Sequence, residues 1–273
     1  MQHHFLREEL AAAWGEHDLF ERVWALEGEV FRNVANRRTL RFEVGGRAYF
    51  AKIHDGAGWR EIFKNLVTLR APVLGARNEY ATCLHLAAKG VPAPTVAAFG
   101  ERGRNPARRQ SFVICDALEG FESLEDVAEA WETAPPDPLV KRRLVMAVAG
   151  FARAMHGAGV VHRDFYICHL LLNRRAFAEG KVELAVIDLH RAQVHGVIPR
   201  RWLRRDLAAL LFSVLDLSLS RSTWLRFVRA YRDTPLQQVF AEEGRFWRGV
   251  HRRALALYRK GLVKGLVQGR FRS

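Results

Sequence analysis

One stretch of this chain, residues 162–173, constrains the fold more than any other part of the sequence. It carries a His-Arg-Asp triplet that ends at Asp164, followed by three leucines at 170–172. The preceding segment, residues 137–156, starts with an Asp-Pro pair and has apolar residues at helical spacing, so it predicts a helix that runs directly into the triplet. Because a solvated loop with a surface ion pair would look similar, the order of the other features decides the interpretation.

Length and composition indicate one large domain or two small lobes around a shared cleft. The chain has 273 residues, and 49% of them are apolar, which argues against disorder. Segments with strand character dominate as far as residue 116, and helical segments dominate after it. Near the start of the chain, we expect a short helix at 5–14 and a first strand at 23–26. We therefore expect an α+β fold with an N-terminal lobe at 1–116 and a helical C-terminal lobe at 117–273.

The cysteines and the apolar runs bear on the compartment. Cys83, Cys115 and Cys168 are odd in number and far apart, which favours a reducing compartment over a disulfide framework. The first residues lack the apolar core of a signal peptide. The most apolar run, 207–219, is shorter than the roughly 20 residues that a bilayer-spanning helix needs. We expect a cytoplasmic protein that is at most peripheral to a membrane.

The chain is strongly basic, with 43 Lys and Arg against 29 acidic residues and a net charge of +14. Such a charge favours nucleic acid, acidic lipid, a phosphorylated glycan or a small acidic protein as partner. No nucleic-acid recognition motif accompanies the charge, so we expect no nucleic acid. The tail at 245–273 contains nine basic and no acidic residues, and it predicts an amphipathic helix that lies on an anionic membrane or packs on the C-terminal lobe.

A lysine interrupts an apolar strand in the N-terminal lobe. Residues 39–53 alternate in strand fashion around a Gly45-Gly46 turn, and the return strand contains Lys52. A buried lysine is costly unless it is paired, and an edge lysine that reaches solvent is the plainer alternative. The next predicted helix, 77–89, has Glu79 in its first turn, where the helix dipole also favours an acid.

In their order along the chain, these features resemble the protein-kinase fold. The resemblance implies that Lys52 pairs with Glu79 and holds the α- and β-phosphates of ATP. It also places the hinge between the lobes at 116–120, so Asp116 and Leu118 would contact adenine through their backbone groups.

The same resemblance assigns roles in the C-terminal lobe. Asp164 would be the general base that accepts a proton from the acceptor hydroxyl, and Asp188, after a strand predicted at 182–187, would bind Mg²⁺. His169 stands where most kinases have a metal-binding Asn. Because imidazole is a poorer Mg²⁺ ligand than oxygen, His169 is predicted either as a metal ligand or as a contact to phosphate or Asp164. Asp206 would hydrogen-bond the catalytic loop.

Three departures from the kinase pattern narrow the acceptor. The region that should be a glycine-rich phosphate cover has only Gly28, and an insert at 57–76 predicts a short amphipathic helix. The segment between Asp188 and Asp206 is too short for a peptide-docking activation loop and lacks Ala-Pro-Glu. A small-molecule or glycan acceptor is therefore favoured over a protein.

Local sequences sharpen the resemblance. The Cys168-His169 pair, the Trp59-Arg60-Glu61 run and the Arg204-Arg205-Asp206-Leu207 helix start are similar to those of bacterial lipopolysaccharide core heptose(I) kinases, over nearly the whole chain. The family resemblance implies ATP- and Mg²⁺-dependent phosphorylation of the first inner-core heptose at the cytoplasmic face of the inner membrane. The acceptor would be a phosphorylated, Kdo-bearing glycolipid, which suits the basic surface.

Two alternatives stay open. A kinase-fold enzyme could act on another sugar, an antibiotic or protein tyrosine. A non-catalytic pseudokinase could bind an anionic lipid or a small acidic protein. The single glycine and His169 motivate the pseudokinase, whereas the presence of Lys52, Asp164 and Asp188 together argues against it.

Overall fold

The computed structural model describes residues 2–15, 18–34, 36–56, 58–59, 63, 75–217, 219–265 and 267. These residues form two compact units. The first contains 1–88, 93–119 and 188–191, and the second contains 89–92, 120–187 and 192–273. The chain thus crosses between units after Glu119, close to the predicted lobe boundary at 116. Most of the predicted insert at 57–76 and the last residues of the basic tail lie outside the described residues.

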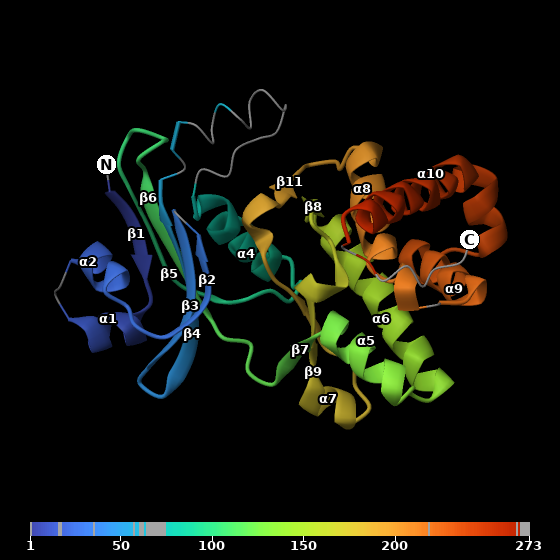
Figure 1. Cartoon of the computed structure of the whole chain (residues 1–273), viewed down its shortest axis with the longest axis horizontal. Coiled ribbons are helices and arrows are strands. Elements are labelled where there is room, and N and C mark those ends of the chain that lie inside the picture. Colours follow the sequence, from blue (N-terminus) through green and yellow to red (C-terminus); the bar gives the residue numbers. More distant parts are fainter. Residues whose placement is uncertain are drawn as a thin grey trace. The chain divides into compact units, whose positions relative to one another are not determined.

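The first unit is built on an antiparallel six-stranded sheet with the order β1-β5-β6-β4-β3-β2 (Figure 1). The strands are β1 (Gln2–Leu6), β2 (Glu29–Val34), β3 (Arg37–Val44), β4 (Arg47–Asp55), β5 (Val96–Arg102) and β6 (Gln110–Asp116). Gly45 and Gly46, both with positive φ, form the turn between β3 and β4, as the sequence predicts.

Three helices accompany this sheet among the described residues: α1 (Glu8–Trp14), α2 (Leu19–Trp24) and α4 (Arg77–Ala88). Two sequence predictions fail here. The segment 23–26, expected as a strand, ends helix α2 instead, because Asp18 caps the backbone amides of Phe20 and Glu21. The segment 5–14, expected as one helix, begins inside β1, which pairs with β5.

The core of the first unit lies between α1, α2 and one face of the sheet. Phe20 and Trp24 of α2 make edge-to-face contacts with Phe112 of β6. Ala51 and Ile53 of β4 are buried in the same cluster. Side chains alternate between the faces of a strand, so Lys52, which lies between them, points to the other face.

The second unit is mainly helical. Its main helices are α5 (Leu124–Thr133), α6 (Pro138–Gly157), α7 (Arg174–Ala178), α8 (Arg200–Phe212), α9 (Arg221–Arg232) and α10 (Leu236–Val263). Its strands are β7 (Phe121–Ser123), β8 (Val160–Val161), β9 (Leu170–Asn173), β10 (Leu184–Val186) and β11 (Gln193–Val194), and its 3₁₀ turns include η1 (Ile167–His169) and η3 (Leu215–Leu217). They form one sheet of order β10-β9-β7 and one β11-β8 pair. The turn η2 (Leu189–Arg191) belongs to the first unit.

Helix α6 delivers the chain to the stretch 162–173. Asp137 caps its start by accepting a hydrogen bond from the backbone amide of Leu139, and its apolar face is buried. After α6, the short strand β8 leads directly to His162. The helix that the sequence predicts before the triplet is therefore present.

The basic tail contributes to α10, which starts earlier than the tail and packs one face inside the second unit. Trp247, Val250 and Tyr258 are buried on that face, whereas Arg252 and Arg259 are exposed. In the described part of the chain, no helix combines the length and apolar character that crossing a membrane requires.

Candidate active site

In the first unit, Lys52 of β4 forms an ion pair with Glu79 of α4, with 2.6 Å between Lys52 Nζ and Glu79 Oε1. Glu79 is almost fully buried. Burial lowers the pKa of Lys52, but the carboxylates of Glu79 and Asp188 outweigh that effect and raise the pKa above its ordinary value. Lys52 therefore stays cationic, as its predicted role in phosphate binding requires.

Asp188 is the meeting point of several cationic or hydrogen-bonding groups. Its Oδ1 lies 3.3 Å from Lys52 Nζ, 3.7 Å from an Arg37 nitrogen and 2.6 Å from His190 Nδ1. The backbone of Asp188 has φ 61°, a left-handed conformation that non-glycine residues rarely adopt. Asn78 of α4 donates to the carbonyls of Leu189 and His190, which holds the following turn in place.

His54 adds a neutral group to this cluster. It lies opposite Arg37 in the β3–β4 register and is buried. Burial, together with the positive charges of Arg37, Lys52 and His190, lowers the pKa of His54 to about 3. The ring is therefore uncharged near neutral pH, which avoids adding a further positive charge beside Lys52.

The predicted hinge residues Asp116 and Leu118 lie at and just beyond the end of β6. The Asp116 carboxylate accepts hydrogen bonds from both terminal nitrogens of Arg7, at 2.6 and 2.8 Å. This pair raises the Arg7 pKa. The Asp116 side chain is thus engaged by the N-terminal segment, and any adenine contact by this residue falls to its backbone. Leu118 is half-buried.

In the second unit, Asp206 of α8 fixes the loop that carries Asp164. Its fully buried carboxylate accepts hydrogen bonds from the backbone amides of His162 (2.6 Å) and Arg163 (2.9 Å). His156 lies 3.4 Å from the same carboxylate and 2.8 Å from the Tyr231 hydroxyl. The contact expected for Asp206 is present, and it ties the loop to α6, α8 and α9.

Hydrogen bonds define the state of His162. Its Nε2 lies 2.8 Å from the Ile187 carbonyl, which can only accept, so Nε2 carries the proton. Its Nδ1 then accepts from the backbone amide of Asp164 at 3.3 Å. The loop around Asp164 is therefore held through main-chain groups, and Asp164 itself is half-buried.

His169 contacts Asp164 through the backbone. Its Nδ1 lies 2.7 Å from the Asp164 carbonyl oxygen, so Nδ1 donates, and its ring stacks on that of His162 with 5.4 Å between centroids. Of the alternatives left by the sequence, the contact to Asp164 is observed. A contact of this ring with phosphate or metal would therefore have to be made through Nε2.

The donor set fits a magnesium ion that arrives with phosphate groups. The described residues contain no group of three or more His, Cys, Asp or Glu side chains able to hold a metal. Mg²⁺ often takes only one or two protein carboxylates, with the rest of its shell from phosphates and water. Asp188 can supply such a carboxylate, whereas the remaining nitrogen of His169 is a poorer match.

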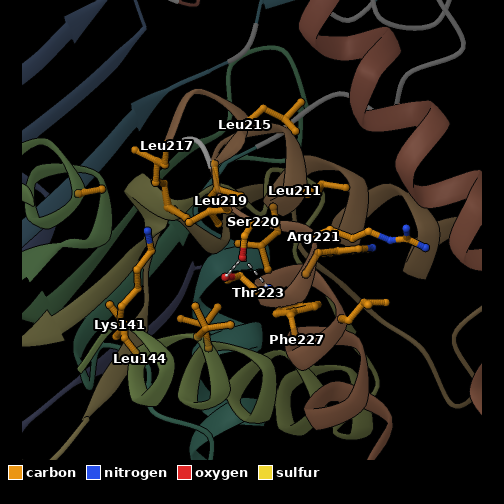
Figure 2. Close-up of a pocket in the computed structure, with 18 of the residues that line it drawn as sticks. Lys141, Leu144, Leu211, Leu215, Leu217, Leu219, Ser220, Arg221, Thr223 and Phe227 are labelled. Carbon is orange, nitrogen blue, oxygen red and sulfur yellow. Dashed lines mark hydrogen bonds between the residues drawn. The ribbon is translucent and has the colours of Figure 1, made fainter. Parts of the chain in front are cut away.

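The second unit also contains a large apolar groove, about 1550 Å³ in volume (Figure 2). Its floor comes from α5, α6, α8, α9 and η3, including Leu144, Leu211, Leu215 and Phe227, and Ile167 extends it to the turn that carries His169. Its basic lining residues are Lys141, Arg221, Arg245, Arg248, His251 and Arg252. The only carboxylate among the lining residues is Asp216, which accepts a hydrogen bond from the Tyr258 hydroxyl.

Sequence reasoning missed several of these residues. Arg7 gives no local signal, because it lies 109 positions from its partner Asp116. Arg37 and His190 lie in segments whose sequences carry no pattern that predicts a contact with Asp188. The groove combines residues from seven elements, namely α5, α6, η1, α8, η3, α9 and α10, so no single segment of the sequence indicates it.

The fold, the cluster around Lys52 and Asp188, and the loop that carries Asp164 together define a class of protein, the kinase-fold phosphotransferases. The BubR1 kinase domain covers 83% of this chain with a TM-score of 0.50 and 13% identity, which shows the fold alone. The α+β, protein-kinase-like fold expected from the sequence is confirmed.

Within that class, the chain belongs to the lipopolysaccharide kinase (Kdo/WaaP) family, which residues 21–231 match. It is 46% identical to the lipopolysaccharide core heptose(I) kinase WaaP of Pseudomonas aeruginosa, over 93% of this chain and 96% of that protein. It is 45% identical to WaaP of Escherichia coli K12, over 87% of this chain and 90% of that protein. A solved structure of WaaP in complex with acyl carrier protein matches with a TM-score of 0.80 and 42% identity, covering 94% and 99% of the two chains.

Proposed function

We propose that this protein transfers the γ-phosphate of ATP to the first inner-core heptose of lipopolysaccharide. The observation that carries the kinase proposal is the half-buried Lys52, paired with both Glu79 and Asp188 in the first unit. The acceptor rests on the relatives, which are named heptose(I) kinases at 45–46% identity. The basic surface suits an acidic glycolipid.

Each predicted site residue receives one role in this proposal. Lys52, oriented by Glu79, holds the α- and β-phosphates, and Asp188 holds Mg²⁺, which supplies charge neutralisation to the phosphates. Asp164 accepts the proton of the heptose hydroxyl as that oxygen forms its bond to the γ-phosphorus, while the bond from the γ-phosphorus to the β–γ bridging oxygen breaks and ADP leaves.

The remaining predicted residues position these groups. His169 orients the Asp164 loop through its bond to the Asp164 carbonyl and offers Nε2 to phosphate. Asp116 and Leu118 contact adenine through their backbone groups. The protein acts at the cytoplasmic face of the inner membrane and binds peripherally, through exposed basic residues.

The test measures transfer of labelled phosphate from ATP to heptose-containing lipopolysaccharide by wild type, Asp164→Asn and Asp233→Asn. Asp233 is exposed and pairs only with Arg153 among the described residues, so its variant controls for loss of one surface carboxylate. We expect Asp164→Asn to lose about 10²–10⁴-fold in kcat while its Kd for Mg·ATP stays at the wild-type value. If Asp164→Asn is as active as the wild type, Asp164 is not the base. Tight Mg·ATP binding without transfer by wild type would refute the acceptor.

A second proposal concerns a partner. We infer that this chain binds a small acidic protein of the acyl carrier type, the partner named in the solved WaaP complex. The groove supports this, because a large apolar floor with a basic edge suits an acyl chain delivered by an acidic carrier. Figure 2 places Lys141 and Arg221 on two sides of the leucine-rich floor.

Calorimetric titration with acyl carrier protein, with and without its acyl chain, tests the partner. The acylated carrier should bind more tightly, because only it can fill the apolar floor. Charge reversal at the groove, Arg221→Glu with Arg248→Glu, should weaken binding by about tenfold or more. Reversal at Arg259, which is exposed on α10 and does not line the groove, is the matched control. Equal effects of the groove and control variants would refute this use of the groove.

A further inference from the structure

A cluster of arginines surrounds Trp202 in the second unit, apart from the groove lining. The guanidinium carbons of Arg163, Arg201 and Arg205 lie 5.1, 5.8 and 4.5 Å from the Trp202 ring centroid. Arg163 immediately precedes Asp164, and the other two lie on α8. The cluster therefore brings guanidinium groups to the loop that carries the proposed base.

Helix α10 adds a further member, Arg253. Arg204 of α8 reaches across α10 at Gly249, where a Cβ would lie only 3.1 Å from the Arg204 Cδ. Gly249 and Arg253 are four residues apart, so they share one helix face. Arg204 and Arg205 are therefore both close enough to Arg253 to act on its charge, and so is Tyr166 of the Asp164 loop.

Three members of this cluster, Arg204, Arg205 and Arg253, have little compensation by acids. Burial first, and then the charges of Arg205 and Arg204, lower the pKa of Arg253. Its buried Nε has no hydrogen-bond partner among the described residues. Across the described ranges, Arg204, Arg205 and Arg253 also form no ion pair with a carboxylate. Adjacent like charges destabilise the folded protein, and a bound anion would relieve that repulsion.

Stacking on Trp202 explains part of the arrangement but not all of it. An indole face attracts the guanidinium of Arg205, yet Arg253 has no aromatic ring in a cation–π contact among the described residues. The charges of Arg205 and Arg204 act on Arg253 instead. Planar guanidinium groups gathered in this way match carboxylate and phosphate oxygens, which accept paired hydrogen bonds.

We propose that Arg163, Arg204, Arg205 and Arg253 form an anion subsite that binds the carboxylate or phosphate of an acidic sugar beside the heptose that receives phosphate. This inference rests on the proposed function, because it names the part of the acceptor that the second unit holds. Arg163 and Tyr166 flank Asp164 in one loop, so an anion held there positions the acceptor at the proposed base. The subsite gives the enzyme a reason to prefer a charged core over neutral heptose.

The experiment uses three soluble probes made from delipidated inner-core oligosaccharide: intact, carboxyl-reduced and dephosphorylated. Calorimetry without ATP gives the Kd, and phosphate transfer gives KM and kcat for each probe. Wild type is compared with Arg253→Gln, Arg205→Gln and the control Arg259→Gln, which removes the same charge from an exposed position on α10. Thermal melts establish that each variant is folded.

We expect one of the two modified probes to bind wild type about tenfold more weakly than the intact one, since each lost charge-assisted bond has roughly that effect. In Arg253→Gln or Arg205→Gln, the intact probe should bind about tenfold more weakly, and its advantage over the modified probe should disappear. KM should rise with little change in kcat, and Arg259→Gln should behave as wild type. The probe that loses affinity identifies carboxylate or phosphate as the anion. If Arg253→Gln fails to fold, Arg205→Gln carries the test, because Arg205 is exposed.

Several outcomes would overturn the subsite. Equal Kd values for all three probes on wild type would do so, as would variants that weaken every probe by the same factor. The same variants are also tested for binding to phosphatidylglycerol vesicles. If Arg253→Gln and Arg205→Gln lose vesicle binding while their Kd for the oligosaccharide is unchanged, the cluster is a membrane contact and not a sugar subsite. Failure of the proposed function is distinguishable: wild type would then bind the charged probe selectively but transfer no phosphate to it.

Discussion

Charged side chains in the first unit hold one another in place, whereas main-chain hydrogen bonds hold the loop in the second unit. Lys52 contacts Glu79 and Asp188 directly, and Arg37 and His190 also approach Asp188. Asp164, in contrast, sits in a loop whose amides bond to Asp206 and to a neutral His162. An ion cluster can exchange partners when phosphate and Mg²⁺ arrive, but a base needs a fixed position beforehand. The two units therefore meet different requirements with different interactions.

The largest effect should come from Asp206→Ala, which removes the acceptor of two buried amides. Each orphaned amide costs about 1–3 kcal/mol, so we expect the free energy of unfolding to fall by about 3–5 kcal/mol. Urea unfolding followed by tryptophan fluorescence measures it. Asp233→Ala, at an exposed ion pair, should change stability by less than about 1 kcal/mol. Similar losses in both variants would break the comparison.

Lys52→Met tests the ion cluster of the first unit. It removes the cation between Glu79 and Asp188, so we expect the Kd for Mg·ATP to rise by about 100-fold. The control is Lys181→Met, at an exposed position. Calorimetric titration gives both values. An unchanged Kd in Lys52→Met would show that this cluster has only a structural role.

His54 makes the first unit sensitive to acid. Its folded-state pKa of about 3 lies below the ordinary value of 6.5, so the unfolded chain binds a proton first as the pH falls. The stability that the neutral His54 contributes is therefore fully present above pH 6.5, and it is lost as the pH falls from 6.5 to 3. Between pH 7 and pH 5, this group should lower the free energy of unfolding by at most about 2 kcal/mol.

Denaturation of wild type and His54→Gln at both pH values measures that loss. The variant should lose less stability than wild type over this range, because glutamine does not titrate. His251→Gln, at an exposed histidine of α10, should follow wild type. Parallel curves for all three proteins would contradict the assignment to His54.

The smallest effect is expected at the pair between Arg7 and Asp116. Both side chains are partly accessible to water, so Arg7→Gln should destabilise the protein by about 1 kcal/mol. The control Arg175→Gln changes an almost fully exposed arginine and should have no measurable effect. Thermal unfolding at matched salt compares them. A loss as large as that of Asp206→Ala would mean that the N-terminal segment is essential to the first unit.

The sequence predicts best where a local signal coincides with a long-range pattern. Lys52 interrupts an apolar strand and therefore needs a partner, and Glu79 lies in the first turn of the next predicted helix. Asp206 was expected to bind the Asp164 loop because its order in the chain fits the kinase pattern. In both cases, the contact is predicted from the order of the residues along the chain, which matches the kinase pattern.

Prediction fails where the chain is ambiguous or the contact is remote. The run Val23-Trp24-Ala25-Leu26 is too short to separate strand from helix by periodicity, and the cap at Asp18 decides for helix α2. The sequence around Asp116 does not predict its ion pair with Arg7, because the two residues are 109 positions apart. The arginines of the proposed subsite come from a loop and two helices, and the packing of α8 on α10 brings Arg204 close to the helix face that carries Arg253.

The positive φ of Asp188 can also help to locate sites of this kind in other structures. In the described part of the chain, three non-glycine residues have positive φ: Arg163, Asp188 and Asp233. Asp233 ends helix α9, where such a conformation is common. The other two lie beside the proposed base and at the proposed Mg²⁺ ligand. A search of main-chain dihedral angles alone, blind to side chains, would thus mark both groups of residues, and it offers a way to find distant relatives whose sequence motifs have drifted.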